Sequence, residues 1–395
     1  MKATSRALDL LLRATGDPQR ELDGIAAGDP EHARAEAIRA GIGVLAKVPE
    51  MLPQITRATR MLATPGLPAR LRFHFEAAEL WVAGDALQAA RHYARIVEHW
   101  PHDLLAMRLA QSCYFFLGQV EQTCTMLDEG LKAWNRTAHS YGFVLAMAAF
   151  SHAEAGHGER SERLGREALA RDPACPMGVH AVAHAIAESR SAGRGAAWMR
   201  SQRAHWSVPS RMRTHNAWHL AMFDLEDGRP APALNLLDHC LLPAAKHSPT
   251  DACDATSLLS GLAAQQLEVG DRWQLLSQAF ERNWRPGFWP YVDMHAAVAH
   301  MRAGAIERSR NFTRGIEHCA AQDDHRGQRA RRVTLPFLRA LALQDTRGPH
   351  VPKLASSDLA PLLHAAGGSR LQLDALAPPR GAVVPLRQRS PATVN

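Results

Sequence analysis

Five histidines recur at matching positions between residues 180 and 295 of this 395-residue chain. The segment GVHAVAHAIAE carries His180 and His184, THNAWHLAMFDLE carries His215 and His219, and YVDMHAAVAH carries His295. Residues four apart share one face of a helix, so each pair of imidazoles points the same way. Imidazole is both a metal ligand and an acid or base near neutral pH. The pattern therefore predicts a site with one of these chemistries.

Carboxylates accompany these histidines. Asp254 lies in the segment DACDATSLL, and Asp293 comes two residues before His295. Histidines with carboxylates form a ligand set for a divalent metal, or an acid–base pair. We expect His184, His219 and His295 to be the metal candidates and to open onto one cavity, with both carboxylates nearby. A divalent metal is the one cofactor that this pattern suggests.

A packing role is an alternative for the same histidines. An imidazole among alanines often only hydrogen-bonds a neighbouring carbonyl or indole. The sequence contains no H-E-x-x-H motif, P-loop, G-x-S-x-G or complete dinucleotide fingerprint that would decide the chemistry. Packing, a small-molecule or enzymatic site, and a metal site therefore all stay open.

Glycines set the helical elements that position these histidines. Three of the histidines, His184, His219 and His295, each precede a glycine by nine residues. Seven glycines follow one another at spacings of 34 to 42 residues: Gly84, Gly118, Gly156, Gly193, Gly228, Gly270 and Gly304. Such a period is typical of helical-repeat solenoids, and each glycine is predicted to end the first helix of a pair. We predict an all-α, tetratricopeptide-like right-handed α-solenoid of antiparallel helix pairs, with the histidines on its concave surface.

The pattern divides the chain into three parts. Residues 1–60 are predicted to form N-terminal helical capping repeats, and residues 71–343 the tetratricopeptide-like helical repeat array. Residues 345–395 are rich in Pro, Gly and Ala. We expect them to be a mostly disordered C-terminal tail with one short helix at DLAPLLHAA.

Composition excludes several classes of partner. The net charge is +7, but the basic residues are scattered and no nucleic-acid-binding motif is present, so a nucleic-acid partner is not expected. No apolar stretch approaches the roughly 18 to 20 residues that cross a bilayer, so no membrane partner is expected. The six cysteines form no CxxC pair. This usage suits a reducing compartment and predicts a cytoplasmic protein.

From Arg70 to Gly304 the chain resembles the tetratricopeptide repeat protein 38 family. The resemblance is carried by AAELWVAGDALQAARHYARIVEHWP, VHAVAHAIAE, HNAWHLAMFDLEDG, DATSLL, VGDRW and VDMHAAVA. It implies a soluble tetratricopeptide-like solenoid and names no reaction. With Trp218, the family's recurrent polar positions make up the candidate ligand-binding residues: His74, His180, His184, His215, Asn216, His219, Asp254, Ser257, Asp293 and His295.

The chain departs from this family at four positions. Gln111 and Ser112 stand where such proteins show His-Asp, and Ala153 and Ala187 stand where they show Glu. We expect a solenoid that binds a protein partner or a small ligand in its concave, histidine-lined groove. The alternative is a metal-assisted, hydrolase-like enzyme that uses the five histidines, and the departures would then make this member degenerate.

Overall fold

The computed structural model describes residues 2–346 and 356–376. This part of the chain is helical, with one isolated β-bridge between Thr15 and Ser210 and no strand. The prediction of an all-α repeat solenoid is confirmed. None of the helices in the described part combines the length and apolar character that a membrane span requires.

The repeat array consists of seven helix pairs. They are α4 (Ala69–Val82) with α5 (Ala86–His99), α6 (Leu104–Phe115) with α7 (Val120–Ala133), α8 (Tyr141–Glu154) with α9 (Gly158–Arg171), α10 (Pro176–Glu188) with α11 (Ala192–Ser201), α13 (Arg213–Glu226) with α14 (Pro230–Leu236), α16 (Pro249–Ala264) with α17 (Arg272–Asn283), and α18 (Pro290–Arg302) with α19 (Ile306–Ala320). The short helices α12 (Arg203–Trp206) and α15 (Leu242–Ala245) extend two of these pairs.

Further helices flank the array. At the N-terminus they are α1 (Ala3–Arg13), α2 (His32–Ala46) and α3 (Leu52–Thr59), and at the C-terminal end α20 (His325–Arg329), α21 (Leu335–Thr346), α22 (Ser356–Ala366) and α23 (Arg370–Leu376). The segment 17–28, which reads as helical in the sequence, contains only a 3₁₀ turn. Gly28 has a φ of 96°, which a helix cannot accommodate.

Capping residues explain where several helices begin. The carboxylates of Asp85 and Asp103 accept hydrogen bonds from the third backbone amides of α5 and α6, as expected of N-caps. Ser248 caps α16 in the same way. Pro176 and Pro290 occupy the first positions of α10 and α18, where the missing N–H costs nothing. The inner helices that carry histidines thus have defined starting points.

Most of the seven regularly spaced glycines end the first helix of a pair, as predicted. Five of them follow the first helix of a pair at positive φ, and two do not. Gly193 lies inside α11, where Arg190 at a φ of 51° makes the turn instead. Gly270 precedes α17, and Gln266 at a φ of 60° ends the longer helix α16. The predicted role is therefore wrong for these two glycines, because other residues adopt the left-handed conformation there.

Two of the seven regularly spaced glycines have different surroundings, so we expect their replacement to lower the stability of the protein by different amounts. Gly228 has a φ of 72° with no heavy atom within 4 Å of an added Cβ, whereas Gly118, at 69°, would place a Cβ 2.7 Å from the backbone oxygen of His364. We expect Gly228→Val to lower the free energy of unfolding by about 1 to 3 kcal/mol through backbone strain. Gly118→Val should cost more, because its neighbour is backbone on α22. Thermal melts of the two variants would contradict this if they coincided.

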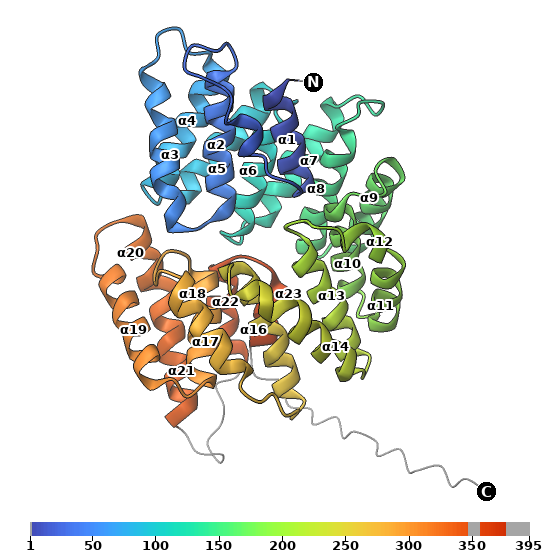
Figure 1. The fold of residues 1–395 in the computed structure, drawn as a ribbon, viewed down its shortest axis with the longest axis vertical. Coiled ribbons are helices and arrows are strands. Elements are labelled where there is room, and N and C mark those ends of the chain that lie inside the picture. The colour runs from blue at the N-terminus through green and yellow to red at the C-terminus, as the bar shows by residue number, and fades with distance from the viewer. Residues whose placement is uncertain (1, 347–355, 377–395) are drawn as a thin grey trace, which may run out of the picture.

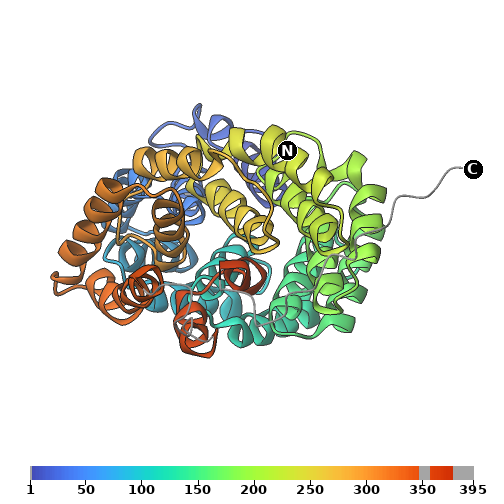
Figure 2. The ribbon, with the colours of Figure 1, turned by 90° about the horizontal axis from the view of Figure 1, so that it is seen from below.

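The superhelix closes on itself after about one turn. The Trp81 ring stacks on the Trp289 ring at a centroid distance of 5.4 Å, and the Arg326 guanidinium donates to the Val82 carbonyl at 2.7 Å. The first and last pairs, far apart in sequence, therefore meet end to end, with the C-terminal end of α4 against the start of α18 and against α20 (Figure 1). Figure 2 shows the resulting ring of helices.

The C-terminal helix α23 lies inside this ring and packs on α16 (Figure 2). The backbone amide of Gly368 donates to the Phe115 carbonyl at 3.0 Å, which attaches the segment before α23 to the end of α6. The expected short helix at DLAPLLHAA is α22, but α23 was not expected in a mostly disordered tail. The rest of that tail, 347–355 and 377–395, lies outside the described residues. Helix α8 is buried over its whole length, packed against α6, α7, α9 and α10.

Candidate functional site

Four imidazoles from two neighbouring inner helices meet inside the ring. His180 and His184 lie on α10, and His215 and His219 lie on α13. The Nε2 atom of His180 is 2.9 Å from the Nε2 atoms of both His184 and His215. One ring nitrogen from each of the four residues lies within 4.8 Å of the others. The i, i+4 pairing thus creates one cluster from two helices, here called the histidine quartet.

Two carboxylates orient two rings of this quartet, each by contact with an Nδ1 atom. The Glu154 carboxylate, at the end of α8, lies 2.7 Å from His184 Nδ1. The Asp254 carboxylate, on α16, lies 2.9 Å from His215 Nδ1. A carboxylate on one ring nitrogen fixes the tautomer and turns the other nitrogen toward a metal, as in many metal sites. Glu154 is a partner that the histidine pattern alone did not reveal.

The ring nitrogens of the quartet cannot all form hydrogen bonds if the four rings are neutral. An ionised carboxylate only accepts, so His184 and His215 carry their protons on Nδ1 and a lone pair on Nε2. Both lone pairs face His180 Nε2, which can donate to only one of them. His219 Nε2 has no hydrogen-bond partner among the described residues. Positive charge at the centre of the quartet, from a metal ion or from added protons, resolves this conflict.

The surroundings act differently on the members of the quartet. Burial, and then the neighbouring imidazoles, lower the pKa of His180 and of His219 well below the usual range. Burial also disfavours the charged form of His215, but Asp254 outweighs it and raises the pKa of His215. The two rings without a carboxylate partner are therefore neutral, which is the form that binds metal.

A cavity of about 240 Å³ adjoins the quartet. Its walls combine three of the imidazoles with aromatic rings and charged groups from distant repeats. Among the lining residues are His180, His184, His215, Phe115, Phe116, Phe150, Lys47, Arg108, Asp251, Asp254, Tyr291, Ser369 and Gln372. His219 does not line it and lies behind the other three. The ring of helices thus surrounds a small, partly open chamber that combines polar side chains with an aromatic wall.

Helix α23 forms one wall of this chamber. The Gln372 side chain donates through Nε2 to the Asp254 carboxylate and accepts through Oε1 from the Tyr291 hydroxyl. Asp254 in turn holds His215. The C-terminal helix is therefore connected to the histidine quartet through a single carboxylate.

Lys47 enters the chamber from the N-terminal part of the chain. Its ammonium donates to the Ser112 hydroxyl and lies 4.4 Å from the centroid of the Phe116 ring. Burial, more than the nearby Arg108 charge, lowers the pKa of Lys47 to about 7. No signal in the sequence identified Lys47, Arg108, Tyr291 or Gln372, because the closure of the superhelix brings them together.

Three other predicted residues lie on the helices that carry the quartet or its carboxylate partner, two on α13 and one on α16. The Trp218 ring stacks on the His215 ring at a centroid distance of 5.2 Å. Asn216 is fully buried, and its amide has no hydrogen-bond partner among the described residues. The Ser257 hydroxyl donates to the Asp254 carbonyl at 2.9 Å. None of the three lines the cavity, and Trp218 is the one that contacts a ring of the quartet.

His295 and Asp293 do not join the quartet. His295 Nδ1 donates to the Tyr291 carbonyl at 2.7 Å, and burial lowers its pKa to about 4. Asp293 accepts from Trp284 Nε1 at 2.8 Å and from the Gly287 amide at 3.1 Å. The structure therefore corrects the metal candidates: His180 and His215 join His184 and His219, and His295 does not. The equal distance of His295 from its glycine did not place it at the quartet, because α16 separates α13 from α18.

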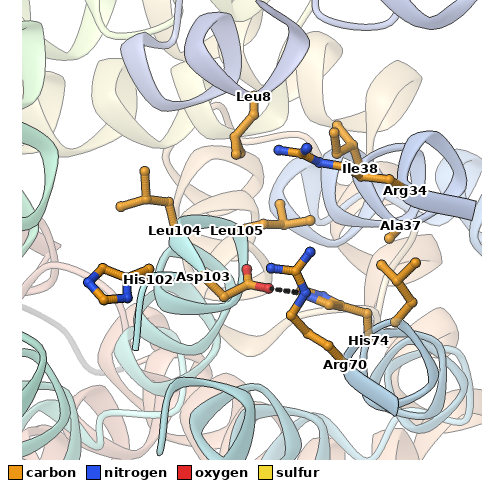
Figure 3. Close-up of a pocket in the computed structure, with 11 residues that line it drawn as sticks. Leu8, Arg34, Ala37, Ile38, Arg70, His74, His102, Asp103, Leu104 and Leu105 are labelled. Carbon is orange, nitrogen blue, oxygen red and sulfur yellow. Dashed lines mark hydrogen bonds and ion pairs between the residues drawn. The ribbon is translucent and has the colours of Figure 1, made fainter. Parts of the chain in front are cut away.

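His74 lies in a second, smaller pocket of about 60 Å³ between α2, α4 and α6 (Figure 3). Its Nε2 atom is 3.1 Å from the Asp103 carboxylate, and Arg70 is 3.7 Å from the same group. Burial opposes ionisation of Asp103, but His74, the Ala106 amide and Arg70 lower its pKa to about 2. This predicted residue thus stabilises the start of α6, away from the quartet.

The departures from the family pattern have separate structural roles. Gln111 Nε2 donates to the Met147 carbonyl at 2.7 Å, and Ser112 accepts from Lys47, so both line the chamber as hydrogen-bonding residues. Ala153 is buried next to Glu154, and Ala187 is half-buried near the end of α10. Glu154 retains a carboxylate at the quartet despite the loss at Ala153.

A second group of metal-ligand types lies outside the ring interior. Cys124, His152 and His157 bring one ligand atom each within 4.8 Å of the others. His152 Nε2 is also 3.0 Å from the Asp128 carboxylate. Burial is the main cause that raises the pKa of the Cys124 thiol to about 12. Any count of bound metal must therefore separate this group from the quartet.

No family model matches the chain. Similar solved structures include a Rap protein complexed with competence and sporulation factor, at 13% identity and a TM-score of 0.45, covering 79% of this chain and 95% of that chain. The Cut9–Hcn1 hetero-tetramer of APC/C has 13% identity and a TM-score of 0.45, covering 94% and 68%. A human IFIT1 dimer with m7Gppp-AAAA has 12% identity and a TM-score of 0.42, covering 94% and 83%. At these TM-scores the likeness carries no argument about ligand or function.

Proposed function

We propose that this protein binds a divalent transition metal ion through His180, His184, His215 and His219, and a small ligand in the chamber beside it. The observation that carries the proposal is the convergence of ring nitrogens whose lone pairs cannot be satisfied by neutral partners. Imidazole ligands suit zinc, copper, iron and nickel. Tetrahedral zinc holds its ligand nitrogens about 3.3 Å apart, so the two 2.9 Å contacts would widen by about 0.4 Å and the wider pairs, separated by up to 4.8 Å, would have to close.

The position of α23 inside the closed ring favours a small ligand over a protein partner. Helix α23 occupies the concave side, and contacts between the first and last pairs close the groove. A chain segment of a partner would have to displace both. The chamber of about 240 Å³ is smaller than the pockets of about 300 to 1,000 Å³ that hold drug-sized molecules. A ligand of the size of a small metabolite fits it.

A metal-assisted enzyme is the second candidate. Three imidazoles of the quartet line the chamber, so a metal at the quartet would face a ligand bound there. Such a metal polarises a carbonyl or lowers the pKa of a bound water if one coordination position stays open. Four histidine ligands around tetrahedral zinc leave no open coordination position, which favours binding over hydrolysis.

We also infer that the chain is a member of the tetratricopeptide repeat protein 38 family, on the segments that contain the quartet.

Metal analysis of the purified protein tests the proposal. We expect one zinc ion per chain in a Cys124→Ala background, which removes the second ligand group. His180→Gln in this background should weaken zinc binding more than about 100-fold, because loss of a mere outer partner already costs 10- to 100-fold. The measurement is a titration against a competing chelator, followed by elemental mass spectrometry.

His295→Gln is the matched control for this experiment. It removes a buried histidine from the same register in another repeat, at a place that does not reach the quartet. Its zinc content should equal that of the parent. Zinc binding that persists unchanged in His180→Gln, or a parent that binds no zinc, would contradict the proposal.

A further inference from the structure

The chamber contains positive groups without acidic partners. Neither Lys47 nor Arg108 forms an ion pair in the part of the chain that the structure describes, although both line the cavity. The Lys47 ammonium has only the Ser112 hydroxyl and the Leu45 carbonyl, at 3.4 Å, as hydrogen-bond partners. Arg108 donates to the neutral amide of Gln111 at 3.2 Å. Lys47 is only 6% exposed and has no counter-charge, so burial disfavours its charged form, and an anion bound in the cavity would stabilise that form.

The acidic residues of the chamber do not supply that anion. Asp254 is already engaged by His215 and by Gln372. Asp251 accepts from no cation, and burial, followed by the charge of Asp254, raises its pKa to about 7. The positive groups therefore face the cavity without an internal partner.

A neutral donor completes this surface. The Ser369 hydroxyl is buried, lines the chamber and has no hydrogen-bond partner among the described residues. The adjacent amide of Gly368 bonds the Phe115 carbonyl at 3.0 Å, next to the Phe116 ring that lies against Lys47. Ser369 and Lys47 therefore both line the chamber near the end of α6, where Phe115 and Phe116 form an aromatic wall.

We propose that the chamber binds a small organic oxyanion, with its carboxylate or phosphate group held by Lys47, Arg108 and Ser369 and its apolar part against Phe115, Phe116 and Phe150. Arginine, lysine and hydroxyl groups are the usual partners of both oxyanions. A cavity of about 150 Å³ accepts benzene, so about 240 Å³ holds a ring with one such group. The inference rests on the proposed function, because the chamber is the one beside the quartet.

Three ligands of similar size test this inference by calorimetry: benzoate, phenyl phosphate and neutral benzyl alcohol. We expect at least one of the two anions to bind and benzyl alcohol not to bind. Benzoate alone would assign a carboxylate, and phenyl phosphate alone a phosphate. Lys47→Met should weaken the anion about tenfold or more, because a hydrogen bond to a charged group is lost. Ser369→Ala should weaken it severalfold.

Lys132→Met is the control, since it removes an equal charge from an exposed position. It should leave anion binding unchanged. Each titration is done on the zinc-loaded and on the chelator-treated protein, and metal content is measured separately. Failure of the metal proposal then shows as absent zinc, whatever the anions do. Neither anion binding to either form, or Lys47→Met binding as tightly as the parent, would overturn the inference.

Discussion

Replacing His180 and His219 together with leucine is expected to abolish zinc binding and, in the presence of a chelator, to keep or raise the melting temperature. These two imidazoles have no carboxylate partner, and His219 Nε2 is buried without any partner among the described residues. Leucine removes this desolvation cost. Zinc at 1,000 times its dissociation constant would stabilise the parent by about 4 kcal/mol. The order of melting temperatures should therefore reverse when zinc is added.

His184→Leu is the contrasting variant for this experiment. It also removes a ligand, but it leaves the buried Glu154 carboxylate without its partner. Breaking one side of a buried pair costs about 3 to 5 kcal/mol. We expect it to melt well below the parent in chelator. Scanning calorimetry with and without zinc makes the comparison, and a double variant as destabilised as His184→Leu would show that the quartet has a packing role.

The second large effect is expected from Gly367→Ala, which should release α23 from the interior. Gly367 has a φ of 67°, and an added Cβ would lie 2.3 Å from the Phe116 carbonyl carbon and oxygen. That neighbour is backbone and cannot move aside alone. Gln372 would then lose Asp254 and Tyr291, and the chamber would open. Hydrogen exchange of the amides of residues 370–376 should accelerate at least about tenfold, because their protection depends on tertiary docking.

Gly66→Ala is a close control for this variant. Gly66 has nearly the same φ, 69°, and no heavy atom within 4 Å of an added Cβ. It carries the left-handed strain of about 1 to 2 kcal/mol without the collision. Exchange at 370–376 should be unchanged there. If the amides of residues 370–376 exchanged equally slowly in both alanine variants, the close contact at Gly367 would not be needed to hold α23 in place.

The sequence predicted the local arrangement of four of the five histidines. Helical spacing placed His180 with His184 and His215 with His219, and the repeat period placed both pairs on adjacent inner helices. These are short-range properties, set by 3.6 residues per turn and by nearest-neighbour packing. The same reasoning failed for His295, because a shared register does not specify how far the superhelix rotates between repeats.

The distant walls of the chamber could not be predicted in this way. Lys47 precedes the array and Gln372 follows it, and they share one cavity only because the superhelix closes. Helix α23 spans only seven residues, RLQLDAL, and although most of them are good helix formers, a helix this short is not stable on its own. Its stability comes from packing on α16 and from the contacts of Gln372, which have no local signature.

The position of α23 along the chain has a consequence for the order of synthesis. Residues 45–291 supply every other wall of the chamber, and they all leave the ribosome before residues 369–376. The quartet is therefore assembled while its chamber still has an open side, and a metal ion can enter it directly. If the quartet binds a metal as proposed, the nascent chain would offer the ion a chamber that lacks one wall, and the finished protein would not.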